Sequence, residues 1–186
     1  MPAEVEIKFR VADRSALARR LRSAGFKIVT RRTHEDNLLF DFPGQKLRRS
    51  GQLLRLRKYG SKWTLTHKCK AIRSRHKVRE ETETGVADGP QMAHILTGLG
   101  LLPGFRYEKF RTEWSDGRGH VVVDQTPIGD FAEIEGGPRW IDATARKLSV
   151  RPVDYITLSY ASLFLQWKRR TGSRAEEMTW NAIGAR

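Results

Sequence analysis

The feature of this sequence that most constrains its fold is an alternation of charged and apolar side chains that recurs in several segments. In residues 3–11, the even-numbered positions are charged and the odd-numbered positions from Val5 onward are apolar. Successive side chains of a β-strand point to opposite faces of its sheet, so this period predicts strands with one apolar and one charged face. Further strands of this kind are expected at 26–33, 36–42, 52–59, 62–70, 76–84, 105–115, 119–126 and 131–136.

Helical periodicity separates these strands at only a few places. A helix is expected after Asp13, which can cap it, and it should stop at Gly25. A second is expected over 88–99, with Asp88 as its cap. Its expected buried stripe consists of Met92, Ile95, Leu96 and Leu99. Two more are expected over 141–148 and 154–168, and 171–186 should form a tail or accessory helix after a main domain of residues 1–170. The prediction is an α+β fold with seven to nine antiparallel strands.

The net charge of +14 implies an anionic partner, because 35 Lys and Arg face only 21 Asp and Glu. Residues 42–79 hold 13 of these cations and no acidic residue, yet several recur at every second position, which indicates strands and not a disordered basic arm. The single Cys69 excludes disulfide frameworks and thiolate zinc sites. No stretch approaches the roughly 18 apolar residues of a membrane span, and no signal-peptide pattern opens the chain, so we expect a cytoplasmic protein that does not enter the membrane.

The charged faces are unusual because acids and bases recur on strands that a sheet would bring together. If the apolar faces pack under helices, the charged faces would point into a closed or nearly closed barrel. Such an interior holds charge only when the charges balance, since an unpaired buried charge costs several kcal/mol or more. Clustered carboxylates bind hard cations such as Mg²⁺ or Mn²⁺, and clustered Arg and Lys bind phosphate oxygens. A lining with both kinds of group predicts a site for a metal-bound polyphosphate.

These residues resemble the CYTH domain, or triphosphate tunnel metalloenzyme, superfamily over about residues 2–168. The E-x-E-x-K signature of that family is matched near the N-terminus, and the other segments follow in the family's order. The matching segments are Glu4-Val5-Glu6-Ile7-Lys8, Arg55-Leu56-Arg57, Lys68, Arg79-Glu80-Glu81-Thr82-Glu83, Lys109-Phe110-Arg111, Asp124 and Phe131-Ala132-Glu133-Ile134-Glu135. The resemblance implies an eight-stranded antiparallel β-barrel, the triphosphate tunnel, with flanking helices.

The resemblance also implies roles for individual residues. It implies metal ligands at Glu4, Glu6, Asp124, Glu133 and Glu135 for Mg²⁺ or Mn²⁺. Glu81 and Glu83 would be tunnel carboxylates that either bind the metal or contact its ligands. The implied catalytic and triphosphate-binding cations are Lys8, Arg55, Arg57, Lys68, Lys109 and Arg111, with Arg79 as a further substrate-binding residue.

The resemblance leaves two reactions open, because members include class IV adenylyl cyclases as well as thiamine triphosphatases, inorganic tripolyphosphatases and RNA triphosphatases. The leading prediction is conversion of ATP to cyclic AMP and pyrophosphate, since length and the segment 35–43 are closest to the bacterial class IV cyclase-like branch. The alternative is hydrolysis of ATP, tripolyphosphate or thiamine triphosphate. Leu39 stands where many relatives place a tyrosine, which disfavours a mechanism in which a tyrosine–lysine pair orients water.

Two further classes compete with an enzyme. A basic nucleic-acid-binding barrel would explain the net charge but not the carboxylates that recur beside the cations, and the chain lacks clustered stacking aromatics. A non-catalytic polyphosphate-binding module would use the same residues as the enzyme. A homodimer is compatible with the sequence but not required by it.

Overall fold

The fold is α+β, as expected, and the computed structural model describes residues 3–73 and 75–184. The strands are β1 (Ala3–Arg10), β2 (Lys27–Asp41), β3 (Leu53–Tyr59), β4 (Lys62–Lys68), β5 (Ile72–Arg73), β6 (Lys77–Val86), β7 (Leu102–Ser115), β8 (His120–Thr126) and β9 (Gly129–Glu135). The helices are α1 (Arg14–Ser23), α2 (Lys46–Arg49), α3 (Gly89–Gly98), α4 (Pro138–Lys147), a 3₁₀ turn (Pro152–Asp154), α5 (Tyr160–Thr171) and α6 (Trp180–Ile183). None of the described helices is long and apolar enough to cross a membrane.

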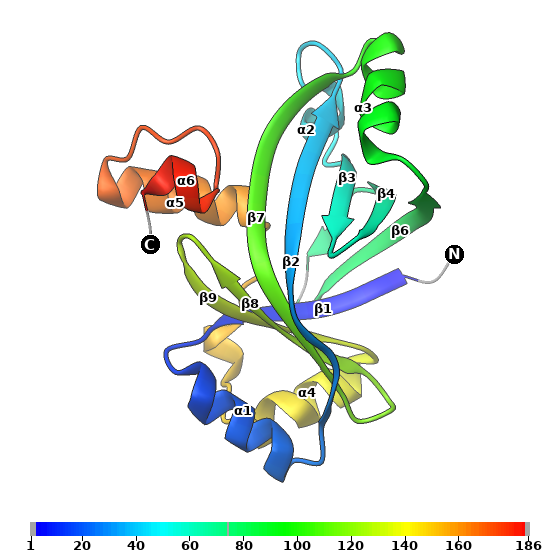
Figure 1. Ribbon diagram of the computed structural model, residues 1–186. Helices are drawn as coiled ribbons and strands as arrows, with labels where there is room; N and C mark the ends of the chain where they lie inside the picture. The colour runs from blue at the N-terminus through cyan, green and yellow to red at the C-terminus, as the bar shows by residue number, and fades with distance from the viewer. Residues whose placement is uncertain (1–2, 74, 185–186) are drawn as a thin grey trace.

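Among the described residues, eight antiparallel strands close into a barrel, which confirms the predicted tunnel architecture (Figure 1). The order is β1-β9-β8-β7-β2-β3-β4-β6, and the ring closes where β1 pairs with β6, for example Glu4 with Arg79. The two-residue strand β5 only extends the edge beside β6. Closure matters because every strand presents one of its two faces to a common interior.

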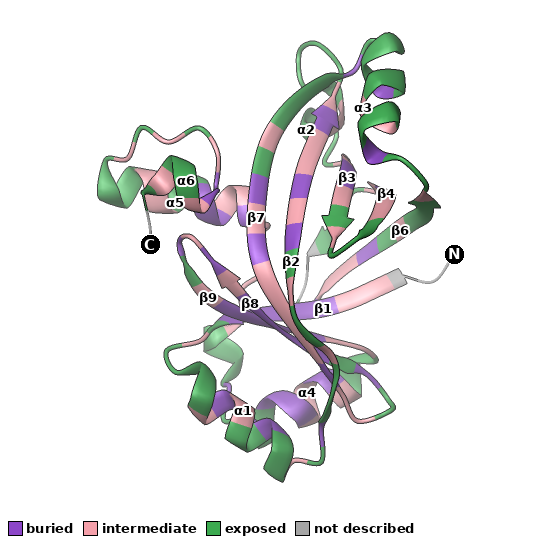
Figure 2. Ribbon diagram, viewed as in Figure 1, coloured by how far each residue is buried: buried purple, intermediate pink, exposed green. Residues whose placement is uncertain are grey.

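The largest apolar core lies outside the barrel and beneath α1 and α4, at the bottom of Figure 1. Ile7 of β1, Val121 of β8 and Ile134 of β9 are completely buried there against Leu21 and Ile141 from the two helices. Figure 2 shows this buried zone where β1, β8 and β9 meet the helices. The apolar faces of the alternating strands therefore point outward under helices, which leaves the charged faces for the interior.

A smaller core holds α3 against β3 and the end of β2, with Leu56 and Leu96 buried. The expected stripe on this helix is partly wrong. Ile95 and Leu99 are 54% and 69% exposed, because α3 contacts the barrel through one narrow edge at Leu96 and Met92.

Two other boundaries differ from the expectation. The strands expected at 26–33 and 36–42 are one 15-residue strand, β2, which stays paired with β7 through several register shifts. The last long helix begins at Tyr160, capped by Ser159, and not at Asp154. The segment before it is extended because Ile156 exchanges two backbone hydrogen bonds with Lys8, at a point of β1 beyond the reach of β6.

The C-terminal residues pack against the barrel. Met178 is completely buried and exchanges backbone hydrogen bonds with Arg106 and Glu108 of β7, and α6 follows it. This segment and α5 enclose a third apolar core that includes Tyr107, Phe131 and Phe164. The chain between residue 171 and residue 184 therefore packs against β7 and α5 outside the closed ring of strands.

Candidate functional site

The charged faces of the strands enclose a cavity of about 420 Å³ inside the barrel. Eight Lys or Arg and seven Glu side chains line it. Of the residues singled out from the sequence, those that line it are Glu4, Glu6, Lys8, Arg55, Arg57, Lys68, Arg79, Glu81, Glu83, Lys109, Arg111, Glu133 and Glu135. The structure therefore brings together every predicted site residue except Asp124.

The acidic wall of the cavity contains a compact carboxylate cluster. One oxygen each of Glu4, Glu6 and Glu135 lies within 4.8 Å of the others. Strand alternation places Glu4 and Glu6 on the same face of β1, and antiparallel pairing sets Glu135 of β9 opposite Glu6. Carboxylate oxygens at this spacing suit a hard divalent cation such as Mg²⁺ or Mn²⁺.

In this structure the carboxylate cluster is held by lysines. Lys68 contacts Glu4 at 3.0 Å, and Lys77 forms an ion pair with Glu6. Burial and the neighbouring carboxylates raise the pKa of Glu135 to about 8, against the opposing charge of Arg111. The carboxyl group of Glu135 therefore keeps its proton at neutral pH unless a cation neutralises the cluster.

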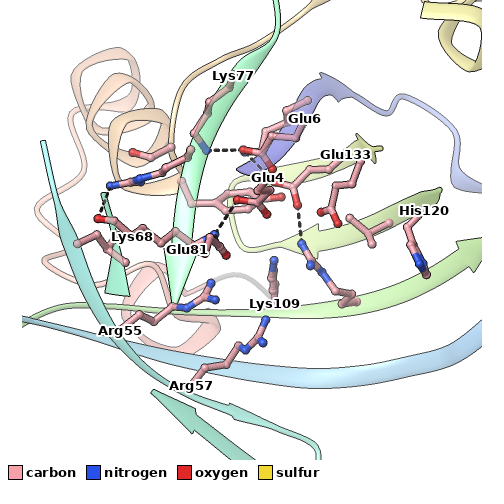
Figure 3. Close-up of a pocket in the computed structure, with 18 of the residues that line it drawn as sticks. Glu4, Glu6, Arg55, Arg57, Lys68, Lys77, Glu81, Lys109, His120 and Glu133 are labelled. Atoms are coloured by element: carbon pink, nitrogen blue, oxygen red, sulfur yellow. Dashed lines mark hydrogen bonds and ion pairs between the residues drawn. The ribbon is translucent and has the colours of Figure 1, made fainter. Parts of the chain in front are cut away.

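The cationic wall lies across the cavity from this cluster (Figure 3). Arg55 and Arg57 share one face of β3, and Arg57 donates to Glu83 of β6 at 3.0 Å. Lys8 lies instead on the acidic side, two residues after Glu6 on β1, and forms an ion pair of 2.8 Å with Glu133, its cross-strand neighbour on β9. These guanidinium and ammonium groups are held in place by carboxylates from other strands of the barrel.

Asp124 lies behind the cavity wall and does not line it. It is completely buried, and its oxygens accept hydrogen bonds of 2.7–2.8 Å from Lys109, Arg111 and Tyr160. A carboxylate with this many donors holds the two cations and has little free capacity for a metal ion. The geometry therefore favours a positioning role for Asp124 over the predicted ligand role.

The sequence reasoning missed Glu35 of β2, which is completely buried beneath the cations. Its oxygens lie 3.4 Å from Lys109, 3.8 Å from Arg111 and 4.0 Å from Arg57. Burial acts to raise the pKa of Glu35, but the surrounding cations, led by Lys109 and Arg111, lower it to about 2. The available signal was the alternation with Asn37 and Leu39, which puts Glu35 on the interior face.

Lys77, Tyr107, Glu113, His120 and Tyr160 also line the cavity without having been predicted. Tyr160 lay inside the expected helix but was not expected to reach the tunnel. Its ring lies beneath Lys8, 4.3 Å from ring centroid to Nζ, and its hydroxyl donates to Asp124. Burial and the charges of Asp124 and Glu133 raise the pKa of Tyr160 well above its usual value. Nothing in the local sequence distinguished it from a core tyrosine.

The lining is close to neutral before any ligand enters. A triphosphate carries roughly four negative charges, so alone it would leave the cavity strongly anionic and face the Glu cluster. A divalent cation entering with it would keep the balance and neutralise the carboxylates. The arrangement therefore suits a metal-bound triphosphate better than a free anion or a free cation.

The comparisons with known proteins agree with this geometry. The model of the CYTH domain matches residues 2–149. The chain belongs to the CYTH domain family. A protein of Methanocaldococcus jannaschii, named as a candidate adenylate cyclase, is 28% identical over 133 residues, which cover 71% of this chain and 75% of that protein.

Two solved structures share the fold of this chain. A candidate adenylate cyclase from Vibrio parahaemolyticus superposes with a TM-score of 0.76 at 19% identity, over 87% of this chain and 97% of that one. A protein from Hippeastrum superposes with a TM-score of 0.66 at 19% identity, over 88% and 95%. The latter is described as a candidate adenylyl cyclase with a dominant triphosphatase activity.

Proposed function

We propose that this CYTH protein is a divalent-metal-dependent enzyme that acts on a triphosphate inside the barrel. One observation carries the proposal: Arg55 and Arg57 lie across a single cavity from the carboxylate cluster of Glu4, Glu6 and Glu135. The carboxylates alone would suit a cation, and the arginines alone would suit an anion. The two walls together suit a complex of a metal ion and a phosphate chain. Phosphoryl transfer needs mainly positioning and charge stabilisation, which such a lining supplies.

In this proposal the carboxylate cluster holds Mg²⁺ or Mn²⁺, with Glu133, Glu81 and Glu83 nearby. A metal ion held by these carboxylates would polarise the phosphoryl oxygens and withdraw charge from them. The triphosphate is gripped by Lys8, Arg55, Arg57, Lys68, Lys109 and Arg111. Lys68 and Lys77, which now contact the carboxylates, exchange those contacts for phosphate oxygens.

The leading reaction is the formation of cyclic AMP from ATP. The ribose 3′-hydroxyl loses its proton to water as its oxygen attacks the α-phosphorus, the bond from that phosphorus to the bridging oxygen breaks, and pyrophosphate leaves with the electron pair. The M. jannaschii relative's name supports this reaction. Hydrolysis is the second candidate. Water attacks the terminal phosphorus, the bond from that phosphorus to its bridging oxygen breaks, and the diphosphate leaves with the electron pair while the attacked phosphorus becomes orthophosphate. The activity described for the Hippeastrum protein supports this reaction.

One experiment separates these reactions. The protein is incubated with ATP, tripolyphosphate and thiamine triphosphate, each with Mg²⁺ or Mn²⁺, and the products are resolved by ³¹P NMR and chromatography. Cyclic AMP with pyrophosphate would support the cyclase, and released orthophosphate would support the hydrolase. Tight binding of a triphosphate without turnover would instead indicate a polyphosphate-binding module. Salt-sensitive RNA or DNA binding without either would favour a nucleic-acid-binding barrel.

A further inference from the structure

Tyr160 reaches the charged cavity from a helix, whereas most of the lining comes from strands. It is the first residue of α5 and lies beyond residues 2–149, which the CYTH model matches. Tyr160 is 7% exposed, and its ring packs between two others. It stacks on Tyr107 at 6.0 Å between centroids and meets Phe131 edge-on at 5.7 Å. These two neighbours fix the orientation of the ring.

Two ammonium groups of the cavity lie against this ring. The Nζ atom of Lys8 is 4.3 Å from the ring centroid, and the Nζ atom of Lys109 is 4.9 Å from it. The face of an aromatic ring carries negative charge that attracts a nearby cation, and the attraction is strongest when water is excluded. Lys8 and Lys109 are only 3% and 2% exposed, so both contacts are shielded from water.

The segment before α5 also holds Lys8. Ile156 accepts a backbone hydrogen bond from Lys8 at 3.2 Å and donates one back at 2.7 Å. The ammonium group of Lys8 donates to the backbone carbonyl of Leu158 at 3.3 Å. Residues 156–160 therefore contact the backbone of Lys8, its ammonium group and, through the ring, its charge. Strand β1 supplies this lysine, and a segment about 150 residues later in the chain places it.

The hydroxyl group of Tyr160 acts on the second lysine. It donates to an oxygen of Asp124 at 2.7 Å, and the same oxygen accepts a hydrogen bond from Lys109 at 2.8 Å. Because Asp124 is completely buried, this carboxylate cannot turn toward water. The ring and the hydroxyl of one side chain therefore both help to fix Lys109.

A neutral ring suits this position better than a further carboxylate would. Lys8 already has Glu133 at 2.8 Å, and Lys109 already has Asp124 at 2.8 Å. Another carboxylate would cancel the remaining positive charge and repel a phosphate chain. The ring attracts both ammonium groups without adding a negative charge, so their positive charge stays available to phosphate oxygens.

We propose that Tyr160 is a positioning residue of the triphosphate site, which holds the ammonium groups of Lys8 and Lys109 in place for the phosphate chain through the face of its ring. This inference rests on the proposed function and adds to it a residue outside the segment that the CYTH model matches. A tyrosine that only filled the core would pack against Tyr107 and Phe131 in the same way. The shape of the ring and its charge distribution therefore have to be varied separately.

The experiment changes the charge distribution of the ring and keeps its shape nearly constant. Tyr160→Phe removes the hydroxyl group, and phenylalanines with increasing numbers of fluorine atoms at position 160 then weaken the negative face of the ring. Calorimetry measures the binding of tripolyphosphate with Mn²⁺, and of Mn²⁺ alone, to each protein. The same fluorinated series at Phe164 is the matched control, because Phe164 is buried in the same helix and core but does not line the charged cavity.

We expect Tyr160→Phe to retain the tripolyphosphate affinity within about threefold, because the face of phenylalanine also attracts cations. The fully fluorinated ring should weaken tripolyphosphate binding by about 10-fold, with a graded fall along the series, because a preorganised pair of cations is lost. The affinity for Mn²⁺ alone should not change, and the series at Phe164 should leave both affinities unchanged.

A tripolyphosphate affinity that stays constant along the series at Tyr160, or that falls equally along the series at Phe164, would overturn the inference and leave the proposed function intact. A wild-type protein that fails to bind tripolyphosphate with Mn²⁺ would overturn the proposed function and the inference with it.

Discussion

Replacement of Asp124 by asparagine separates two roles for this buried carboxylate, metal ligand or positioning residue. The side chain is completely buried and accepts hydrogen bonds from Lys109, Arg111 and Tyr160. Removing one partner from a buried ion pair typically costs about 3–5 kcal/mol. Arg111 keeps Glu133 at 2.6 Å and Lys109 keeps Glu35 at 3.4 Å, so we expect the lower value, about 3 kcal/mol.

For a chain of this length, that loss corresponds to a fall in Tm of about 6–12 °C. The assay is thermal unfolding of the metal-free protein at pH 7, followed by Mn²⁺ titration of the folded Asp124→Asn variant. We expect the Tm to fall and the Mn²⁺ affinity to change little. Glu135→Gln is the control with the opposite pattern: it should raise the metal-free Tm at pH 7, because glutamine avoids the cost of protonating this carboxyl on folding, and it should remove Mn²⁺ binding. An unaltered Tm for Asp124→Asn together with lost Mn²⁺ affinity would refute the positioning role.

The remaining predictions concern the same cavity. Because the pKa of Glu135 is raised to about 8, metal binding at pH 7 should release about one proton. Calorimetry in buffers of different ionisation enthalpy measures this release. Metal binding without proton release would contradict the carboxylate cluster as the metal site. Because the folded-state pKa of Glu135 exceeds its unfolded value of 4.5, its contribution to stability is present at low pH and lost as pH rises from about 4.5 to 8; urea unfolding of wild type against Glu135→Gln should show this difference. The pKa of Glu35 is lowered from 4.5 to about 2, so its contribution to stability is present above pH 4.5 and lost as pH falls to about 2. Glu35→Gln should therefore lower the free energy of unfolding by about 3 kcal/mol at pH 7. That variant and the wild type should converge near pH 2, and equal stability at pH 7 would count against the reasoning. Arg57→Ala should weaken triphosphate binding about 10–100-fold and monophosphate binding much less, and equal losses would argue against a grip on several phosphates. Glu6→Gln should abolish turnover with the fold intact by circular dichroism, and full activity at ordinary metal concentrations would refute Glu6 as a ligand.

Much of the fold could be predicted because strand alternation is a local property. The charges of β1 and of β3 fall at every second residue, and this alone put Glu4, Glu6, Arg55 and Arg57 on interior faces. The closed barrel of eight strands came from resemblance to the CYTH family, since alternation does not count or order strands. Helix boundaries were harder to predict from the sequence. The start of α5 depended on the pairing of Ile156 with Lys8, which lies 148 residues earlier in the chain.

The sequence by itself determined which side chains face inward, because in a strand that choice depends only on whether a position is odd or even. It could not determine which inward groups touch. Asp124 lies on the face of β8 that alternation predicts, yet its oxygens accept hydrogen bonds from Lys109 and Arg111. Glu135, in contrast, is set opposite Glu6 by the pairing of β1 with β9. Only the closed barrel decided these partners, because they come from strands far apart in the chain. Only the placement of α5 beside the barrel brought Tyr160 to the cavity, where its hydroxyl donates to Asp124.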